Sequence, residues 1–403
     1  MTAAAPVPQA RRVLTIAPTP FFGDRGCHVR ILEEVRGLQA RGTEVLVATY
    51  ATGTEVAGVR TVRAPNLPGL RARPLGPSYG RPVLDTVLAG TALRAARCFR
   101  PDIVHAHLHE GVAVGWLAAR LVGSPLVADL QGSLLSELVD HRFLKDGGLG
   151  SALVGAMEGW LVRRPDALLV GSPTVARLLA DQHVDPARVV SFPDGVDLTR
   201  FRPMPPDHAQ VDRLGLRDKR VVVFLGVLTA YQGVDALIEA APLVIAAVPD
   251  AHFLILGYPN EAHYRHMASQ RGLDGHMTFP GRIPYDDAAR WLNLGAVAVS
   301  AKTSRTEANG KLLNYMACGL PVVATDTPIN RELLGEAGCY AAVDDPAALA
   351  ARLSELLRAP TRAREVGAAL RRRVEAEFSW PYLTERLLLV YERLLAGQTA
   401  AAA

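Results

Sequence analysis

The sequence predicts an α/β protein made of two doubly wound domains, each with a parallel sheet between layers of helices. The chain has 403 residues, a length typical of two domains. Short apolar runs alternate with stretches of helical periodicity in both halves, which is the pattern of strand–helix–strand units. A proline-rich connector at residues 201–207 (FRPMPPD) separates the halves, and the alternation starts again after it.

The first half, residues 1–200, is expected to form an N-terminal Rossmann-like domain. Its apolar runs are short and continuous, as in strands that are buried on both faces of a parallel sheet. We expect strands at residues 13–17, 44–49, 103–107, 126–130, 167–170 and 188–192, and helices at 27–40, 83–100, 112–121, 134–144 and 152–163.

The second half, residues 201–377, is expected to form another Rossmann-like domain. Strands are predicted at residues 220–225, 252–256, 277–279, 297–300 and 321–324, with helices between them. A third segment, residues 378–403, begins with an amphipathic helix at 378–395 that contains Trp380. It ends in the tail GQTAAAA, which we expect to be disordered.

Composition and charge exclude several classes of protein. No run of about 18 apolar residues occurs, so we predict no membrane span. The N-terminus lacks an apolar secretory core, and the four cysteines are scattered, which fits a reducing cytoplasm. The net charge of +4 is too small for a nucleic-acid-binding protein.

The positive excess lies in residues 1–200, which hold 22 Lys and Arg against 18 Asp and Glu. Three of the arginines, Arg94, Arg97 and Arg100, recur at helical spacing. They suit either a solvated helix face or peripheral contact with an anionic acceptor or the inner face of an acidic membrane.

A candidate anion site lies between the strand at 297–300 and a short helix predicted at 311–318. The polar loop 303–310 holds one glycine, Gly310, directly before that helix. Lys302, Arg305 and Lys311 place positive charge there, with Glu307 among them. A helix start at the carboxyl end of a strand favours anions, so we predict phosphate binding, with an ordinary strand-to-helix turn as the alternative.

Three stretches together resemble one enzyme family. They are NYMACGLPVVAT at 314–325, followed by Glu332; FPDGVDLTRFRP at 192–203; and PFFGDRGCHVRILEEVRGLQARG at 20–42. Their joint order resembles that of the retaining glycosyltransferases of family four, which have the GT-B fold. The resemblance implies two domains that face a cleft, with residues 1–200 on the acceptor side and residues 201–377 as the nucleotide-sugar domain. It also implies a last helix that returns to the first domain. It also implies transfer of a sugar from a nucleotide diphosphate sugar to an acceptor hydroxyl, without a metal or a bound cofactor.

The resemblance places site residues in the first half of the chain. The loop of Gly23, Asp24, Arg25 and Gly26 matches the family's first glycine loop, near the donor diphosphate and the acceptor. A bare turn is the alternative for this loop. Gln131 stands where many relatives have a histidine that contacts the donor sugar. A glutamine can bind hydroxyl groups, but it cannot act as an acid near neutral pH.

In the second half the chain departs from the family pattern. Gly226 matches the family's glycine, but Val227 and Gln232 replace an arginine and a lysine that bind the diphosphate. We therefore expect the cations to come from Lys302, Arg305 and Lys311 instead. Asn314 replaces an acidic residue that holds the ribose. The resemblance further implies that Glu307 and the amides of Ala308, Asn309 and Gly310 hold the sugar and phosphates, that Ile283 borders the base and that Glu332 supports the loop.

Other chemistries fit the sequence less well. The fingerprint G-x-G-x-x-G is absent, which argues against a nicotinamide enzyme. His105, His107 and His109 alternate at the end of a strand, and we expect a structural or acceptor-contacting role rather than a metal site, with His107 nearest the cleft. The alternatives are another GT-B enzyme, such as an epimerase or a phosphorylase, and a non-catalytic partner that binds sugar nucleotides.

Overall fold

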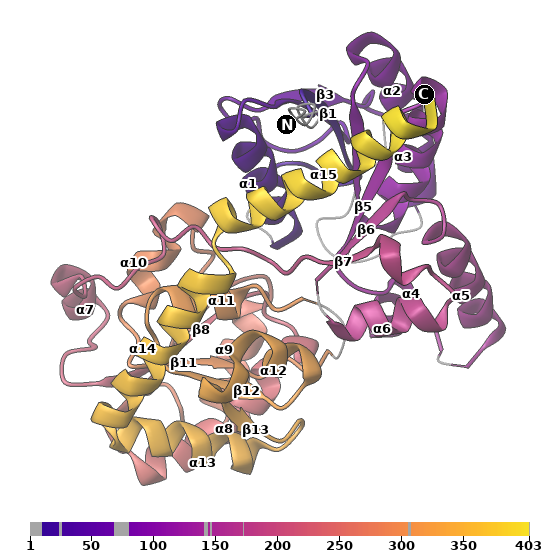
Figure 1. The fold of residues 1–403 in the computed structure, drawn as a ribbon. Helices are drawn as coiled ribbons and strands as arrows, with labels where there is room; N and C mark the ends of the chain where they lie inside the picture. The colour runs from indigo at the N-terminus through magenta and orange to yellow at the C-terminus, as the bar shows by residue number, and fades with distance from the viewer. Residues whose placement is uncertain are drawn as a thin grey trace. The chain divides into compact units, whose positions relative to one another are not determined.

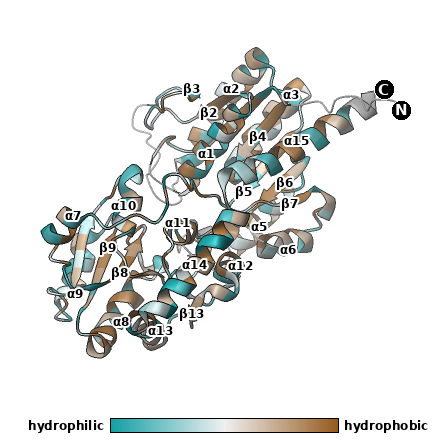
Figure 2. Cartoon of the chain, turned by 60° about the vertical axis from the view of Figure 1, so that its left-hand side comes forward, coloured by the Kyte–Doolittle hydropathy of each residue, from teal (hydrophilic) through white to brown (hydrophobic). Residues whose placement is uncertain are grey.

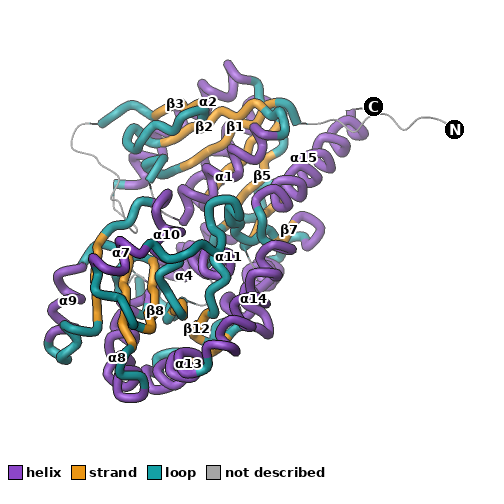
Figure 3. Tube along the Cα trace, turned by 90° about the vertical axis from the view of Figure 1, so that its left-hand side faces the viewer, coloured by secondary structure: helices purple, strands orange, loops and turns teal. Residues whose placement is uncertain are grey.

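The structure is a computed structural model that describes residues 10–23, 26–67, 80–140, 144–145, 147–171, 173–304 and 308–402. These residues form two compact units (Figure 1). The first unit runs up to Pro193 and also contains the chain from Trp380 onward, while the second holds most of the chain from Asp194 to Ser379. Within each unit, strands form a sheet that helices cover (Figure 3).

The described part of the first unit contains a parallel seven-stranded sheet in the order β3-β2-β1-β4-β5-β6-β7. The strand order reverses between β1 and β4, where ligands of doubly wound sheets bind at the carboxyl ends. The predicted strands are confirmed, with end positions shifted by at most two residues. The strands are β1 (Arg12–Ala17), β2 (Glu44–Thr49), β3 (Arg60–Arg63), β4 (Ile103–His107), β5 (Leu126–Leu130), β6 (Ala167–Val170) and β7 (Val189–Ser191).

Helices cover both faces of this sheet because successive strand residues point to opposite sides. In β1, Leu14 and Ile16 pack in one core with α2, α3, α5 and α6, whereas Val13 and Ala17 pack in another core with α1 and α15. The helices are α1 (Gly26–Ala40), α2 (Arg81–Phe99), α3 (Leu108–Val122), α4 (Leu134–Asp140), α5 (Leu149–Leu161), α6 (Pro173–Asp181), the short 3-10 helix η1 (Pro186–Arg188) and α15 (Trp380–Ala402).

The last helix, α15, packs closely on α1. Its Leu383, Leu387 and Tyr391 are fully buried in the core that α1 shares. Gly37 of α1 permits this approach, because a Cβ atom there would lie 2.1 Å from the Thr384 hydroxyl oxygen. The C-terminal segment of the chain is thus an integral part of the first unit's core.

The described part of the second unit holds a six-stranded parallel sheet in the order β10-β9-β8-β11-β12-β13. Its order reverses between β8 and β11, so the same rule places a ligand site after these two strands. Val222 and Phe224 of β8 face one core, and Val221 and Val223 face the other. The strands are β8 (Arg220–Leu225), β9 (Ala251–Leu256), β10 (Met277–Gly281), β11 (Val297–Ser300), β12 (Val322–Thr325) and β13 (Cys339–Ala341).

Helices α8, α9 and α13 cover one face of the second sheet, and α10, α11, α12 and α14 cover the other. The strands β8 and β9 are mostly hydrophobic, whereas α14 is mostly hydrophilic (Figure 2). The helices are α7 (His208–Arg213), α8 (Val234–Ala247), α9 (Glu261–Ser269), α10 (Ala288–Leu292), α11 (Lys311–Ala317), α12 (Pro328–Leu334), α13 (Pro346–Arg358), α14 (Pro360–Glu377) and the 3-10 helices η2 (Ala230–Gln232), η3 (Tyr285–Asp287) and η4 (Gly335–Ala337).

Several expectations about the elements were wrong. The tail expected to be disordered continues α15 to Ala402, because alanine is the best helix former. Of the helix expected at 134–144, the described part is α4 (Leu134–Asp140), and residues 141–143 lie outside the described residues. Strands β3 and β13 and the helices α6 and α7 were not predicted. No helix in the described ranges is both long and apolar enough to cross a membrane.

Candidate active site

Gly226 lies directly after β8, at the point where the strand order of the second sheet reverses. Its amide N–H donates to the Leu256 carbonyl at 2.9 Å, which continues the pairing with β9. The Tyr315 hydroxyl accepts a hydrogen bond from the Leu225 N–H at 2.7 Å and thereby fixes α11 beside the same strand end. The strand end and the start of α11 are thus held as one rigid corner.

Lys311, the first residue of α11, points its ammonium group into this corner. Its Nζ donates to Oε1 of Gln232 at 2.5 Å and lies 4.5 Å from the centre of the Phe224 ring. A Cβ atom on Gly226 would lie only 2.7 Å from Nζ, so a larger residue at this position would displace the lysine. Lys311 therefore places its charge against Gln232, one of the two positions where the family pattern has a cation.

The loop that precedes α11 is anchored by Asn309. Its side-chain Nδ2 donates to Oδ1 of Asn330 at 2.7 Å and to Oγ of Ser300 at 3.1 Å, and the residue is 3% exposed. Asn330 in turn donates to the Thr325 carbonyl at 2.8 Å. The Asn309 side chain, predicted at the donor site, thus ties the ends of β11 and β12 together and leaves its backbone as the part that could reach a ligand.

The other predicted donor-site residues of the second unit lie on several elements and differ in how exposed their side chains are. Lys302 follows β11 and is 3% exposed, and its carbonyl accepts from the Thr325 hydroxyl at 2.5 Å. Gly310 lies against Asp194, because a Cβ atom on it would lie 3.1 Å from that carboxylate. Ala308, Asn314, Ile283 and Glu332 are half-buried, on the loop, on α11, after β10 and on α12 respectively.

Four residues singled out by the sequence, Asp24, Arg25, Arg305 and Glu307, lie outside the residues that the structure describes. Their neighbours are described: Gly26 begins α1 and is exposed, and Gly23 is half-buried. A Cβ atom on Gly23 would lie 3.1 Å from Nδ1 of His28, so this loop runs close to the first turn of α1.

Gln131 follows β5 in the first unit, and the segment behind it is held by a buried glutamate. The carboxylate of Glu158 accepts from the Ser133 hydroxyl at 3.1 Å and from the N–H groups of Leu134 and Leu135 at 3.2 and 3.0 Å. It thereby caps the N-terminus of α4. His109 lies 3.3 Å from the same carboxylate. Although burial acts to raise the pKa of Glu158, the bonds from His109, Leu135 and Ser133 outweigh it and lower that pKa.

The amide nitrogen of Gln131 is itself buried and has no hydrogen-bond partner among the described residues. A buried donor of this kind is a polar group that a ligand could satisfy. Glu158 and Ser133 fix the chain next to Gln131, so this amide sits on a pre-organised loop at the carboxyl end of β5.

A buried ionic cluster lies beneath the carboxyl ends of β4 and β5. Arg30 of α1 binds Asp129 of β5 with two parallel bonds, both 2.7 Å long, and also donates to the Phe192 carbonyl at 3.0 Å. Nδ1 of His107 is 2.9 Å from Asp129. Burial would raise the pKa of Asp129, but Arg30 and His107 outweigh this effect and hold that pKa well below the ordinary range of an aspartate.

His107 was predicted on the acceptor side, yet its side chain is 1% exposed and belongs to this cluster. The ring of His105 stacks on it with centroids 4.5 Å apart, and the Tyr391 hydroxyl of α15 lies 2.7 Å from His105 Nδ1. Burial and the nearby His107 lower the pKa of His105 well below its usual value. The cluster thus connects α1, β4, β5 and α15 inside the first unit.

The same cluster contains three potential metal ligands. The Nε2 atoms of His105 and His107 lie 3.8 and 3.9 Å from Oε2 of Glu34, so two histidines and a carboxylate converge. However, Arg30 already lies 3.1 Å from Glu34 and supplies a cation to both carboxylates. This arrangement is that of a buried ion-pair network, and it explains the cluster without a metal.

Sequence reasoning missed Arg30, Glu34, Glu158 and Tyr391 as members of these networks. One signal was present: Asp129 interrupts the apolar strand LVADL, and a charge inside a buried strand requires a partner. The partner is 99 positions away in the chain, and a single sequence does not reveal such a distant pairing.

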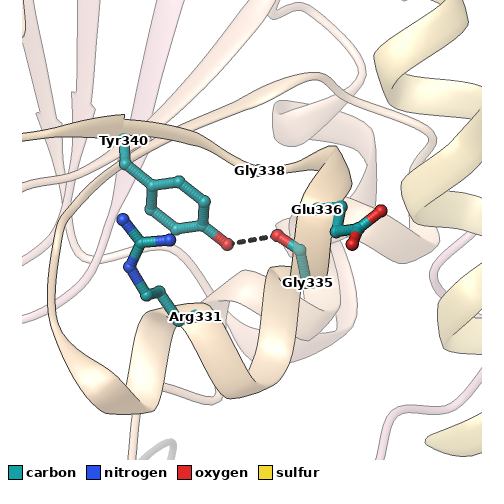
Figure 4. Close-up of a pocket in the computed structure, with 5 residues that line it drawn as sticks. All are labelled: Arg331, Gly335, Glu336, Gly338 and Tyr340. Carbon is teal, nitrogen blue, oxygen red and sulfur yellow. Dashed lines mark hydrogen bonds between the residues drawn. The ribbon is translucent and has the colours of Figure 1, made fainter.

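A surface pocket of the second unit contains an arginine that is already paired (Figure 4). Arg331 lies over the Tyr340 ring at 4.7 Å and binds Asp326 at 2.5 Å. The Tyr340 hydroxyl donates to the Gly335 carbonyl at 2.5 Å. The polar groups of this pocket are therefore engaged with each other, and the pocket is a weaker candidate for anion binding than the corner that holds Lys311.

Comparison with known proteins relates both units to one family. Residues 25–195 match the family model of the glycosyl transferase 4-like domain, and residues 219–359 match that of the glycosyl transferases group 1. The D-inositol 3-phosphate glycosyltransferase of Mycolicibacterium paratuberculosis is 30% identical to this chain over 422 aligned positions. The alignment covers 97% of this chain and 92% of that protein.

Solved structures share the fold at lower identity. Sucrose-phosphate synthase from Thermosynechococcus elongatus superposes with a TM-score of 0.83 at 19% identity, over 96% of this chain and 100% of that one. HepE from Anabaena, solved in complex with UDP-glucose, superposes with a TM-score of 0.74 at 17% identity, over 97% and 99% of the two chains. Both likenesses concern the fold alone, and they identify it as GT-B.

Proposed function

The chain belongs to the glycosyl transferases group 1, a family of GT-B glycosyltransferases that use nucleotide sugars, and from this we propose that it catalyses retaining transfer to an acceptor hydroxyl without a metal ion. The observation that carries the proposal is the position of Lys311. Its ammonium group lies at the end of β8, against Gln232 and over Gly226. A cation at this point neutralises the charge that grows on a leaving diphosphate.

The proposed reaction step needs no covalent intermediate with the enzyme. The bond between the anomeric carbon and the diphosphate oxygen breaks as a bond from that carbon to the acceptor oxygen forms on the same face. The acceptor proton passes to the departing phosphate oxygen, so no dedicated base is needed. The protein contributes positioning and anion stabilisation, with Lys311 at this strand end and Lys302 directly after β11 as the proposed cations.

The other assignments follow the same proposal. Gln131 binds a hydroxyl of the donor sugar through its buried amide nitrogen, and Glu307 also binds the sugar, as the family resemblance implies. The backbone of Ala308–Gly310 binds phosphate oxygens. Ile283 borders the base, Asn314 binds the ribose more weakly than a carboxylate would, and Glu332 supports the loop.

The comparisons suggest which substrates to test first. HepE was solved with UDP-glucose, and the curated relatives are named for D-inositol 3-phosphate. We therefore propose a uridine nucleotide sugar as the donor and a phosphorylated cyclic polyol as the acceptor.

The test is turnover of UDP-sugars and GDP-sugars with D-inositol 3-phosphate, in excess chelator and in parallel with magnesium. We expect release of nucleoside diphosphate together with a new glycoside, at equal rates in chelator and magnesium. Donor turnover that yields only an isomerised nucleotide sugar would identify an epimerase instead. Activity that is lost in chelator and restored by magnesium would contradict the metal-independent mechanism.

A further inference from the structure

The outer face of α5 is apolar along its whole length, which is unusual for a helix that faces water. Leu149 is 93% exposed, Leu153 73%, Met157 46% and Trp160 44%. These residues recur at intervals of three and four, so they form one stripe. The single charged residue of α5, Glu158, is buried on the opposite side against His109.

The stripe continues onto the neighbouring helix α3. The rings of Trp160 and Trp116 meet edge to face with centroids 5.5 Å apart, which places the two helices side by side. Leu117 and Leu121 of α3 are exposed at 45% and 38%. Together these side chains make an apolar surface over α3 and α5, which we call the leucine face.

Arginines surround the leucine face. Arg164 lies over the rings of both Trp160 and Trp116, at 4.1 and 5.3 Å, and Arg120 lies over Trp116 at 5.6 Å. A hollow next to Val122 at the end of α3 is lined by Arg97 and Arg100. Within the described residues, no carboxylate lies within ion-pair distance of the rim arginines, which are Arg97, Arg100, Arg120 and Arg164.

Arginines in the last turn of a helix also stabilise its dipole, and Arg97 and Arg120 lie in the last turns of α2 and α3. That effect does not account for the whole rim, because Arg100 lies beyond the end of α2 and Arg164 beyond the end of α5. A dipole effect would also not explain why the leucines between the arginines face water.

We propose that the leucine face and its arginine rim dock on the surface of an anionic lipid bilayer. Apolar side chains on an amphipathic surface enter the headgroup–acyl boundary, and arginines at its rim meet the lipid phosphates while their stems stay among apolar groups. Tryptophan beside arginine is typical of this boundary.

Charge complementarity favours a bilayer over a second copy of the chain. The carboxylates on α2, α3 and α5 are already engaged: Asp85 accepts from Tyr50, Glu110 pairs with Arg81, and Glu158 is buried. Two copies that met through this face would bring arginine rims together with few carboxylates to receive them. An anionic bilayer supplies phosphate groups for every rim arginine. The proposal is independent of the transfer chemistry, so its test uses no sugar substrate.

The test is co-sedimentation of the full chain with vesicles of equal parts phosphatidylglycerol and phosphatidylcholine, compared with pure phosphatidylcholine. We expect binding to the anionic vesicles that weakens between about 0.1 M and about 0.5 M salt. The variant Leu149→Glu/Leu153→Glu should lower the partition coefficient about tenfold or more, since it puts charge where apolar surface must enter lipid. Arg97→Glu/Arg120→Glu should lower it on anionic vesicles.

The matched control is Leu389→Glu, because Leu389 is 64% exposed on α15, which packs on the other face of the sheet. It should bind vesicles like the wild type, and thermal melts should show that all variants fold. Absence of wild-type binding to the anionic vesicles would overturn the proposal. An equal loss in Leu389→Glu would also overturn it. Light scattering that shows a dimer, abolished by Leu149→Glu/Leu153→Glu without any vesicle binding, would assign the face to self-association instead.

Discussion

Replacing Lys311 by alanine perturbs the proposed diphosphate site most directly. The Lys311 ammonium group reaches the end of β8, where it contacts Gln232 at 2.5 Å and lies 4.5 Å from the centre of the Phe224 ring. An alanine leaves this corner without that charge. A hydrogen bond to a charged group contributes about 1.5–3 kcal/mol, so diphosphate affinity should fall about 10- to 150-fold.

Isothermal titration with UDP and with uridine separates charge from shape. Lys311→Ala should weaken UDP binding by that factor and leave uridine binding nearly unchanged, because uridine carries no phosphate. The turnover number should fall further than the affinity does, because negative charge on the diphosphate grows as the glycosidic bond breaks.

The matched control is Lys219→Ala, since Lys219 is an exposed lysine just before β8, at the opposite end of that strand. It should leave UDP affinity and turnover unchanged, and thermal melts should confirm that both variants are folded. Unchanged UDP affinity in Lys311→Ala would refute the assignment of the cation. Equal weakening of UDP and uridine would show that Lys311 shapes the corner rather than binding phosphate.

Three further outcomes are expected. The double variant Gln232→Lys/Lys311→Gln moves the positive charge to the other side of one hydrogen bond. It should recover part of the UDP affinity that is lost in Lys311→Ala. A UDP affinity as low as in Lys311→Ala would contradict the idea that a cation at either position binds the diphosphate. Arg30→Met should lower the free energy of unfolding by about 3–5 kcal/mol because Asp129 stays buried without its ion pair, while the exposed Arg36→Met should change it by less than about 1 kcal/mol. Burial raises the pKa of Asp85 to about 6, so the folded state binds this proton more tightly than the unfolded state does. The resulting gain in the free energy of unfolding is complete below pH 4 and is lost as the pH rises through 6. Urea melts of the wild type and of Asp85→Asn should show a difference on the order of 1–3 kcal/mol across that window.

The sheet strands could be predicted from the sequence because most are continuous apolar runs. β3 escaped prediction because it is an edge strand of sequence RTVR, with an arginine at each end and one apolar residue. β13 has three residues, too few for a periodic signal. The tail was expected to be disordered because of its simple composition, but alanine propensity extends α15 to Ala402.

The strand-end positions of the candidate site residues could be predicted from the sequence, but their contacts could not. Gly226, Lys302 and Gln131 each follow an apolar run in the sequence, which places them after the carboxyl ends of strands. In a parallel sheet these ends lie along the same edge. Lys311 and Gln232 meet across 79 positions of sequence, and Arg30 and Asp129 across 99. Such pairings depend on how helices pack on the sheet, which one sequence does not specify. The same reason explains why His107 proves to be buried with Asp129.

The most direct measurement of the proposed function is the anomeric configuration of the product of transfer from an α-linked UDP-sugar, recorded by proton NMR in excess chelator before the sugar can equilibrate. D-inositol 3-phosphate is the first acceptor to test. If this acceptor is not used, the anomeric configuration can be recorded on the sugar released by slow hydrolysis of the donor. We expect an α-anomer as the first product, formed at a rate that magnesium does not change. A β-anomer as the first product would contradict retention and with it the proposed mechanism.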